Sequence, residues 1–301
     1  MTARKVALIA PGQGSQRPGG LVDLPPVAKA WFDRASALID VDLWQAGLDW
    51  SQEQLGRPST LQPFLVAWGM SDFDAAQGVM AEAGEADFVL GHSSGQNTAL
   101  VLSGALDFDD AIRFAHERGK HLDLGCETEP GALLALAGVD QSLADEMAAA
   151  TRLQIANYNA PNQFVLGGPR AAAEAALNWA DRRDIASVLL RVNGAFHTEL
   201  FARSDELSLP LIDALPLRDG FTPLIGNARG QLIETAAELR DELRDQYTRP
   251  IHWVAALQTA YDQGVRCFAV IGPGNAMAGL VRRFGTSVDE RPTIVRLNQS
   301  R

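Results

Sequence analysis

The sequence contains little that would build a metal, disulfide or membrane protein. Only two of its 301 residues are cysteines, Cys126 and Cys267, and neither belongs to a CxxC pair, so neither a zinc site nor a disulfide framework is predicted. No run of about 18 uncharged apolar residues occurs. Pro11 and Gly12 follow the first apolar run too early for a signal peptide. These absences predict a cytoplasmic protein with no metal site and no membrane partner.

Basic residues and nucleotide-binding loops are also scarce. Lys and Arg number 26 against 37 Asp and Glu, which gives a net charge of -11 and argues against a nucleic-acid partner. No Gly-Lys-Ser or Gly-Lys-Thr occurs, so a Walker loop is excluded. The GQG of residues 12–14 and the GPG of residues 272–274 have Arg17 and Met277 where a dinucleotide fingerprint needs its third glycine.

What the sequence does contain is a 47% hydrophobic share arranged as alternating strands and helices. Short apolar runs at 5–10, 87–90 and 265–271 end at glycine or proline and predict buried strands. Helical spacing at 27–39, 65–83 and 275–284 fills the intervals. This alternation favours a parallel sheet in an α/β fold.

The middle of the chain has a different order. Strand, helix, strand, strand, helix and strand are predicted in turn at 132–137, 142–151, 153–157, 163–166, 170–179 and 186–192. That order is typical of ferredoxin-like subdomains. We therefore expect a catalytic subdomain formed by 1–128 and 194–301, with a ferredoxin-like subdomain, 129–193, inserted into it.

The GHSSG of residues 91–95 satisfies the G-x-S-x-G pattern between a predicted strand and a helical stretch at 96–105. In this context the pattern indicates a nucleophile elbow, where flanking glycines allow a sharp turn that exposes the serine. Ser93 is therefore the candidate nucleophile. The alternative is an ordinary strand-to-helix turn, which small residues also favour.

A serine nucleophile needs a base, and the chain has five histidines. His92 is adjacent to the serine and is expected to be structural, whereas His116 and His121 lie on one helical stretch and are expected to face solvent. His252 with Asp245 would match the usual hydrolase order, but it begins a predicted helix after a proline.

His197 is the remaining histidine, and it follows a strand-like run on a predicted loop, a good place for chemistry. The residues by themselves favour His197 over His252 only modestly.

Four short stretches, taken together, resemble the malonyl-CoA:acyl carrier protein transacylase family. They are PGQGSQ at 11–16, the GHSSG elbow, GAFH at 194–197 and GPG at 272–274 followed by Gly279 and Leu280. The resemblance extends nearly from end to end. It implies an α/β-hydrolase-like large subdomain with a parallel sheet and an inserted ferredoxin-like small subdomain, in agreement with the organisation above.

The resemblance also implies roles for individual residues. Ser93 would be the nucleophile and His197 its general base. In this family a backbone carbonyl orients the histidine, and QYTRP at 246–250, which is similar to the family's QLxxP, points to Gln246. The backbone N–H groups of Gln13 and Ser94 would form the oxyanion hole.

Substrate choice would depend on three further residues that the resemblance selects. Arg118 matches the family's RGxxM arginine and would bind the free carboxylate of malonyl. Gln62 would lie near the site, and Phe196 would disfavour a methyl branch on the acyl group. The chain departs from the family pattern at Gln96 and Asn97, where Glu and Tyr or Phe are usual.

The implied partners are malonyl-CoA, a coenzyme A thioester used as substrate with no bound cofactor, and an acidic acyl carrier protein. The enzyme is expected to be a monomer, and fatty-acid synthesis is the favoured pathway over polyketide synthesis or malonate decarboxylation. A basic patch at Arg282 and Arg283, or at Lys120 with Arg113, would dock the carrier. The rival interpretations are a serine thioesterase or acyl hydrolase and a non-enzymatic docking subunit.

Overall fold

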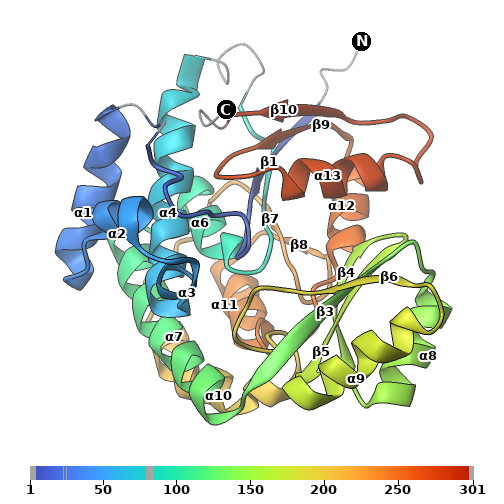
Figure 1. Cartoon of the computed structure of the whole chain (residues 1–301). Coiled ribbons are helices and arrows are strands. Elements are labelled where there is room, and N and C mark those ends of the chain that lie inside the picture. Colours follow the sequence, from blue (N-terminus) through green and yellow to red (C-terminus); the bar gives the residue numbers. More distant parts are fainter. Residues whose placement is uncertain (1–4, 23, 25, 79–84, 298–301) are drawn as a thin grey trace.

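The first of two β-sheets organises the larger part of the molecule (Figure 1). The computed structural model describes residues 5–22, 24, 26–78 and 85–297. In spatial order the first sheet contains β10 (Thr293–Arg296), β9 (Val265–Val270), β1 (Lys5–Ala10), β2 (Phe88–Gly91), β7 (Leu224–Ile225) and β8 (Leu232–Ile233). All neighbours pair in parallel except β7 and β8. The predicted parallel sheet is therefore present.

Both faces of this sheet are buried, which explains why its central strands are mostly apolar. On β1, Ala7 and Ile9 pack in one core with helices α12 (Trp253–Asp262) and α13 (Ala276–Phe284). Val6 and Leu8 point the other way, into a core shared with helices on the opposite face.

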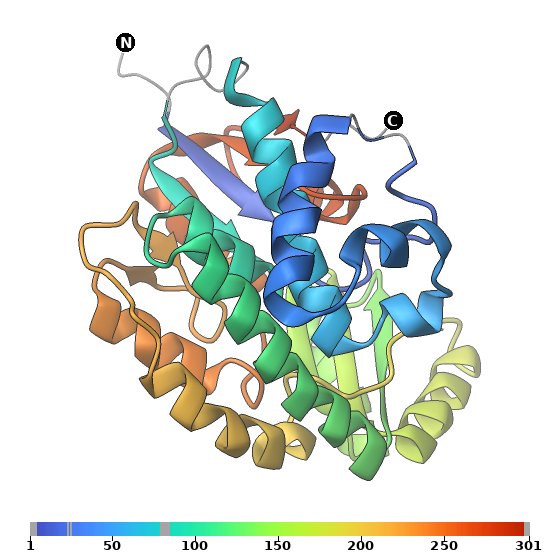
Figure 2. The same cartoon turned by 90° about the vertical axis from the view of Figure 1, so that its left-hand side faces the viewer.

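Apart from two helices on the second sheet, the remaining helices surround the first sheet and extend away from it (Figures 1 and 2). They are α1 (Lys29–Ile39), α2 (Leu43–Asp49), α3 (Gln52–Leu55), α4 (Pro58–Ala75), α6 (Gly95–Leu102), α7 (Phe108–Thr128), α10 (Ala202–Asp213) and α11 (Ala236–Asp245), with single 3-10 turns at Pro26–Ala28 and Glu199–Phe201. Among the described residues, no helix combines the length and apolar character that a membrane span requires.

The second sheet has the order β4-β5-β3-β6 and is antiparallel throughout. Its strands are β3 (Gly131–Ala137), β4 (Gln154–Ala160), β5 (Gln163–Pro169) and β6 (Ala186–Leu189), and α8 (Gln141–Thr151) and α9 (Arg170–Asp181) pack on it. In chain order the strands are arranged 2-3-1-4, with a helix after the first and the third. The predicted α/β fold with a ferredoxin-like unit is confirmed, while its exact boundaries stay a prediction.

Two local predictions were wrong. The helix expected from Leu65 begins at Pro58 and contains Pro63. A proline is tolerated at the first helical position because the N–H that it lacks would have no partner within the helix there. The helical stretch expected from 65 to 83 also reaches beyond the described residues. His116, expected in solvent, is 9% exposed, and its Nδ1 donates a hydrogen bond of 2.8 Å to the carbonyl of Ser59.

The packing of α7 against α4 explains why His116 is buried. A Cβ at Gly119 would lie 2.4 Å from the Cα of Ser59, so the two helices approach too closely for a side chain there. His121 is half-buried, with Nδ1 3.1 Å from the hydroxyl of Ser208 on α10. The charged residues along α7 favoured an exposed helix, but α4 and α10 pack against it.

Candidate active site

The turn between β2 and α6 carries Ser93 in a strained conformation. Its φ is 53°, in the left-handed region that a residue with a side chain rarely adopts. A Cβ at Gly91 would lie 2.3 Å from the carbonyl oxygen of Gly95, and one at Gly95 would lie 2.4 Å from that of Ala10. The two glycines are therefore required for the turn, and the geometry is that of a nucleophile elbow.

Asn227, which follows β7, stabilises the elbow through hydrogen bonds to its backbone. Its Oδ1 accepts a 2.9 Å hydrogen bond from the backbone N–H of Ser93, and its Nδ2 donates one of 2.8 Å to the carbonyl of Gly91. The carboxylate of Glu242, from α11, accepts from the backbone N–H groups of Asn227 and Ala228. Sequence reasoning missed Asn227, whose partners in the elbow are 134 and 136 residues away along the chain.

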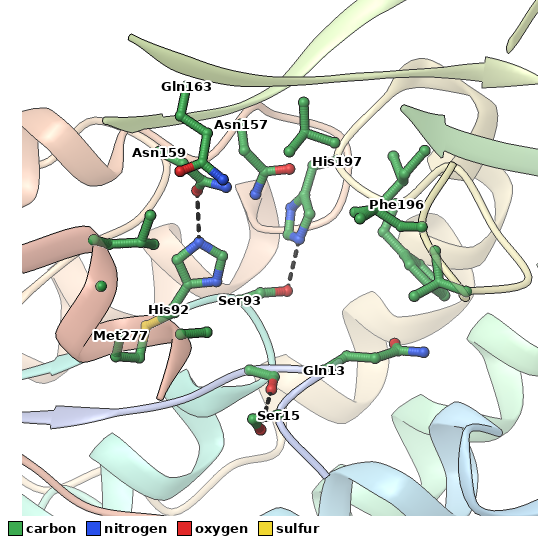
Figure 3. A pocket seen from close by; sticks show the side chains of 18 of the residues that line it. Gln13, Ser15, His92, Ser93, Asn157, Asn159, Gln163, Phe196, His197 and Met277 are labelled. Atoms are coloured by element: carbon green, nitrogen blue, oxygen red, sulfur yellow. Dashed lines mark hydrogen bonds between the residues drawn. The ribbon is translucent and has the colours of Figure 1, made fainter. Parts of the chain in front are cut away.

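His197 lies directly against the serine (Figure 3). Ser93 Oγ and His197 Nε2 are 2.7 Å apart, and His197 Nδ1 is 2.8 Å from the main-chain carbonyl oxygen of Gln246. Because that carbonyl can only accept, it fixes the proton on Nδ1 and leaves Nε2 free to accept from the serine. The backbone N–H of His197 donates to the carbonyl of Tyr247 at 3.0 Å, and its φ is 66°.

The electrostatic environment keeps this imidazole neutral. Burial lowers the pKa of His197 to about 3, although its hydrogen bond to Gln246 works in the opposite direction. The side chain is 3% exposed. A neutral ring with an available Nε2 lone pair is the form that a general base needs.

The Gln246 side chain also takes part in this arrangement. Its Nε2 donates to the carbonyl of Ser93 at 3.0 Å and to the side-chain oxygen of Gln96, while its Oε1 accepts from Arg118 at 2.7 Å. The resemblance pointed only to its carbonyl. Both parts of Gln246 therefore connect the base to the elbow.

A cavity of about 350 Å³ opens beside the Ser93–His197 pair and lies between the two sheets. Its wall from the second sheet includes the amides of Asn157, Asn159 and Gln163 (Figure 3). His92 also lines it, with Nε2 2.9 Å from Asn159 Oδ1, and burial lowers its pKa. Sequence reasoning missed the three amides, because nothing in the sequence distinguishes them from other strand residues, and only the fold places them at the cavity.

Of the two predicted oxyanion donors, Gln13 lines this cavity, whereas Ser94 is not among the lining residues. The backbone N–H of Gln13 donates to the hydroxyl of Ser94 at 3.1 Å. Ser94 is buried and immediately precedes α6, so its own N–H is at a helix N-terminus. In this arrangement the backbone N–H of Gln13 is hydrogen-bonded to the Ser94 hydroxyl and is not available to an oxyanion.

Arg118 does not line the cavity. It is fully buried, and its Nη1 donates to Gln246 Oε1 while Nη2 donates to the carbonyl of Leu243 at 2.7 Å. Nη2 also forms an ion pair of 3.3 Å with Asp205 Oδ1. The guanidinium lies over the ring of Tyr247, 4.4 Å from its centroid.

The other two residues expected near the substrate are placed differently from each other. Phe196 lines the cavity. Gln62 is buried behind it, where Nε2 donates to the hydroxyl of Tyr247 at 2.9 Å and Oε1 accepts from Asn97 at 3.0 Å. The Tyr247 ring stacks on His197, with centroids 5.3 Å apart. Among the described residues, Tyr247 therefore connects Gln62 to the base.

The fold and this geometry are suited to a class of enzymes in which a serine could form a covalent acyl ester, with a histidine placed to act as base and a main-chain carbonyl where the usual acid would be. Within the described ranges, no three His, Cys, Asp or Glu side chains are placed to hold a metal ion.

Comparison with known proteins narrows the class. The malonyl CoA-acyl carrier protein transacylase of Bacillus subtilis (strain 168) is 30% identical over 289 residues, which are 93% of this chain and 90% of that protein. The malonyl-CoA:acyl carrier protein transacylase of Xanthomonas oryzae pv. oryzae is 29% identical with a TM-score of 0.89, covering 99% of this chain and 95% of that one. No protein-family model matches.

A third relative is a malonyl-transacylase solved in complex with its type II PKS acyl-carrier protein. It is 26% identical, has a TM-score of 0.87, and the match covers 98% of this chain and 95% of that one. The chain belongs to the malonyl CoA-acyl carrier protein transacylase family.

Proposed function

We propose that this chain moves a malonyl group from coenzyme A to the phosphopantetheine thiol of an acyl carrier protein, through a malonyl ester on Ser93. The observation that carries the proposal is the 2.7 Å contact between Ser93 Oγ and the neutral His197. Family membership supports the choice of acyl group and acceptor.

In the first half-reaction Ser93 Oγ attacks the thioester carbonyl carbon while its proton passes to His197 Nε2. The negative charge that develops on the carbonyl oxygen would be met by the N–H groups of Gln13 and Ser94, once the Ser94 hydroxyl has turned away from Gln13. Collapse of the tetrahedral intermediate breaks the carbon–sulfur bond, and His197 returns the proton to the leaving thiol.

The second half-reaction runs the same steps in reverse with a new thiol. The carrier's phosphopantetheine thiol gives its proton to His197 and attacks the ester carbonyl, and Ser93 Oγ leaves with that proton. Amide side chains of Asn157, Asn159 and Gln163 line the cavity that the arm would enter and can hydrogen-bond to its amides. No bound cofactor enters this scheme, since coenzyme A acts as substrate.

Acyl selectivity in this proposal belongs to Arg118, with Gln62 and Phe196 in supporting positions. A malonyl carboxylate loses its water when it enters the site and needs a cation, for which a guanidinium offers paired donors. A single residue connects Arg118 to the elbow, since the side-chain amide of Gln246 hydrogen-bonds to both Arg118 and the Ser93 carbonyl. Phe196 at the cavity wall would restrict a methyl branch on the acyl group.

Carrier docking is proposed at the cavity mouth. Arg283 is exposed and lines the cavity, and Arg282 is its exposed neighbour on α13. The other candidates are already paired, Lys120 with Glu117 at 2.7 Å and Arg113 with Asp110 at 3.8 Å. A monomer working in the cytoplasm, without nucleic-acid or membrane partners, and a role in fatty-acid synthesis complete the proposal.

The test is to incubate the chain with malonyl-CoA, locate the adduct by peptide mass analysis, and then add an acyl carrier protein that bears its phosphopantetheine. A malonyl ester on Ser93 that is transferred to the carrier is the expected result, with Ser93→Ala as the control that forms none. Release of malonate to water without transfer would instead indicate a thioesterase. Absence of any adduct would leave only a non-enzymatic docking role.

A further inference from the structure

The guanidinium of Arg118, which the proposed function assigns to the substrate carboxylate, already forms an ion pair with a buried carboxylate. Arg118 on α7 and Asp205 on α10 form an ion pair in which the side chains are 0% and 6% exposed. Exposed ion pairs elsewhere on the surface, such as Arg203 with Glu206, are well solvated. A pair taken out of water is costly to assemble, so its presence beside the active site calls for an explanation.

Asp205 is held firmly in its place. Its Oδ2 accepts from the hydroxyl of Thr248 at 3.1 Å, and a backbone hydrogen bond from Tyr247 also favours its charged form. Burial works in the opposite direction and raises the pKa of Asp205. The Asp205 carboxylate is therefore a well-fixed partner of Arg118. It is hydrogen-bonded to Thr248, in the same segment whose Gln246 carbonyl orients His197.

Arg118 is held but not saturated. Three of its contacts are to Gln246 Oε1, Asp205 Oδ1 and the Leu243 carbonyl. Its Nε is buried and has no hydrogen-bond partner among the described residues. A guanidinium has five N–H donors, so Arg118 keeps donors for another acceptor while its charge is already neutralised by a neighbour.

The cavity offers an entering carboxylate no alternative cation at depth. Of the described residues that line it, Arg283 alone carries a formal charge, and Arg283 is exposed. A second carboxylate placed on Arg118 would also lie close to Asp205, where like charges repel strongly in a site with little water.

We propose that Asp205 is a specificity-determining residue: a built-in carboxylate that holds Arg118 in the unacylated enzyme and that the acyl carboxylate must displace. This inference rests on the proposed function. In the free enzyme Asp205 compensates the buried guanidinium. In the malonyl-enzyme the acyl carboxylate takes over that contact, and Asp205 keeps Thr248 and the Tyr247 N–H.

The test compares Asp205→Asn and Asp205→Ser with wild type, measuring kcat/KM for malonyl-CoA and acetyl-CoA and inhibition by free malonate and acetate. Glu206→Gln is the matched control, because it removes one negative charge from the next residue of α10, where the side chain is exposed and paired with Arg203. Asp205→Glu tests whether a carboxylate of different reach restores wild-type behaviour.

With the competing carboxylate gone, the malonyl-to-acetyl ratio of kcat/KM should rise about tenfold, and the malonate inhibition constant should fall by a similar factor. Acetate inhibition should not change, and malonate should raise the melting temperature of Asp205→Asn more than that of wild type. Asp205→Glu should return the ratio toward wild type, and Glu206→Gln should leave it unchanged.

Three outcomes would overturn the inference. One is an unchanged ratio in folded, uncharged variants of a wild type that does form malonyl-Ser93, which would leave the proposed function intact. Another is a reduced malonyl preference, which would make Asp205 a support for Arg118. The third is failure of both uncharged variants to fold even with saturating malonate, which would make the carboxylate a structural requirement. A wild type that forms no malonyl-Ser93 defeats the proposed function as well.

Discussion

The Ser93–His197 pair and the Arg118–Asp205 pair are close neighbours that are built in opposite ways. Ser93 and His197 both have positive φ values of 53° and 66°, lie on turns and face the cavity. Arg118 and Asp205 come from the regular helices α7 and α10 and are closed off from solvent. Gln246 contacts members of both pairs.

The difference shows two ways of fixing a functional group. Main-chain geometry holds the reacting atoms, because the elbow glycines and the Gln246 carbonyl set their positions. Side-chain charges hold the group proposed to select the substrate, so its position depends on a counter-ion and can change when another carboxylate enters. Each pair should therefore respond differently to substitution.

The largest effect is expected from Ser93→Ala. It removes the nucleophile and should lower kcat by about four to six orders of magnitude, while the free energy of unfolding should change little, because Ala keeps a Cβ at the same positive φ. Steady-state transfer assays and urea unfolding measure the two quantities. Residual turnover at a tenth of wild type would show that the reaction does not pass through this serine.

Arg118→Ala should affect both selectivity and stability. Loss of the guanidinium should reduce kcat/KM for malonyl-CoA by about two to three orders of magnitude and leave acetyl-CoA far less affected. It also leaves Asp205 buried without its cation, at a cost of about 3–5 kcal/mol in the free energy of unfolding.

The matched experiment for Arg118 is the double variant Arg118→Ala with Asp205→Ala. Because it leaves no unpaired charge, it should be more stable than Arg118→Ala alone. If urea unfolding shows the two single losses simply adding, the buried pair is not a unit.

Asn227→Ala tests the hydrogen bonds that stabilise the elbow. Ser93 N–H and the Gly91 carbonyl both lose their partner, so stability should fall by about 1–3 kcal/mol. A less well-positioned nucleophile should lower kcat about 10- to 100-fold with little change in KM. An unchanged kcat in a destabilised variant would limit Asn227 to a structural role.

The smallest effect is a pH dependence that belongs to His197. Its pKa is about 3 in the folded protein against an ordinary value of 6.5, so below pH 6.5 the unfolded chain binds a proton that the folded chain does not. Stability due to this group is complete above that pH and decreases as the pH falls toward 3, by about 2 kcal/mol at pH 5.

The measurement is the difference in free energy of unfolding between wild type and His197→Gln at pH 7 and pH 5. Burial also lowers the pKa values of His92, His121 and His252 and raises those of Asp123, Asp205 and Glu242, and all of these groups are common to both proteins. Parallel slopes for the two proteins would contradict the depressed pKa of His197.

Short-range patterns predicted the elements well where the pattern itself sets the geometry. The apolar runs became β1, β2 and β9 nearly as expected, and the elbow glycines proved sterically necessary. The apolar spacing placed the start of one helix at Leu65, whereas the helix begins at Pro58 and includes Pro63. His116 was missed because helical charge patterns do not show which other helices pack on a surface.

By itself, the sequence determined the turn that exposes Ser93, because the turn leaves no room for a side chain at positions 91 and 95, and both are glycine. It also determined the order of strands and helices, through the spacing of apolar residues. Only the tertiary structure decided that His197 meets Ser93, that Asn227 supports the elbow and that Arg118 pairs with Asp205. Those contacts join residues 87 to 134 positions apart, and no local pattern specifies them, because they exist only after the two sheets and their helices have packed.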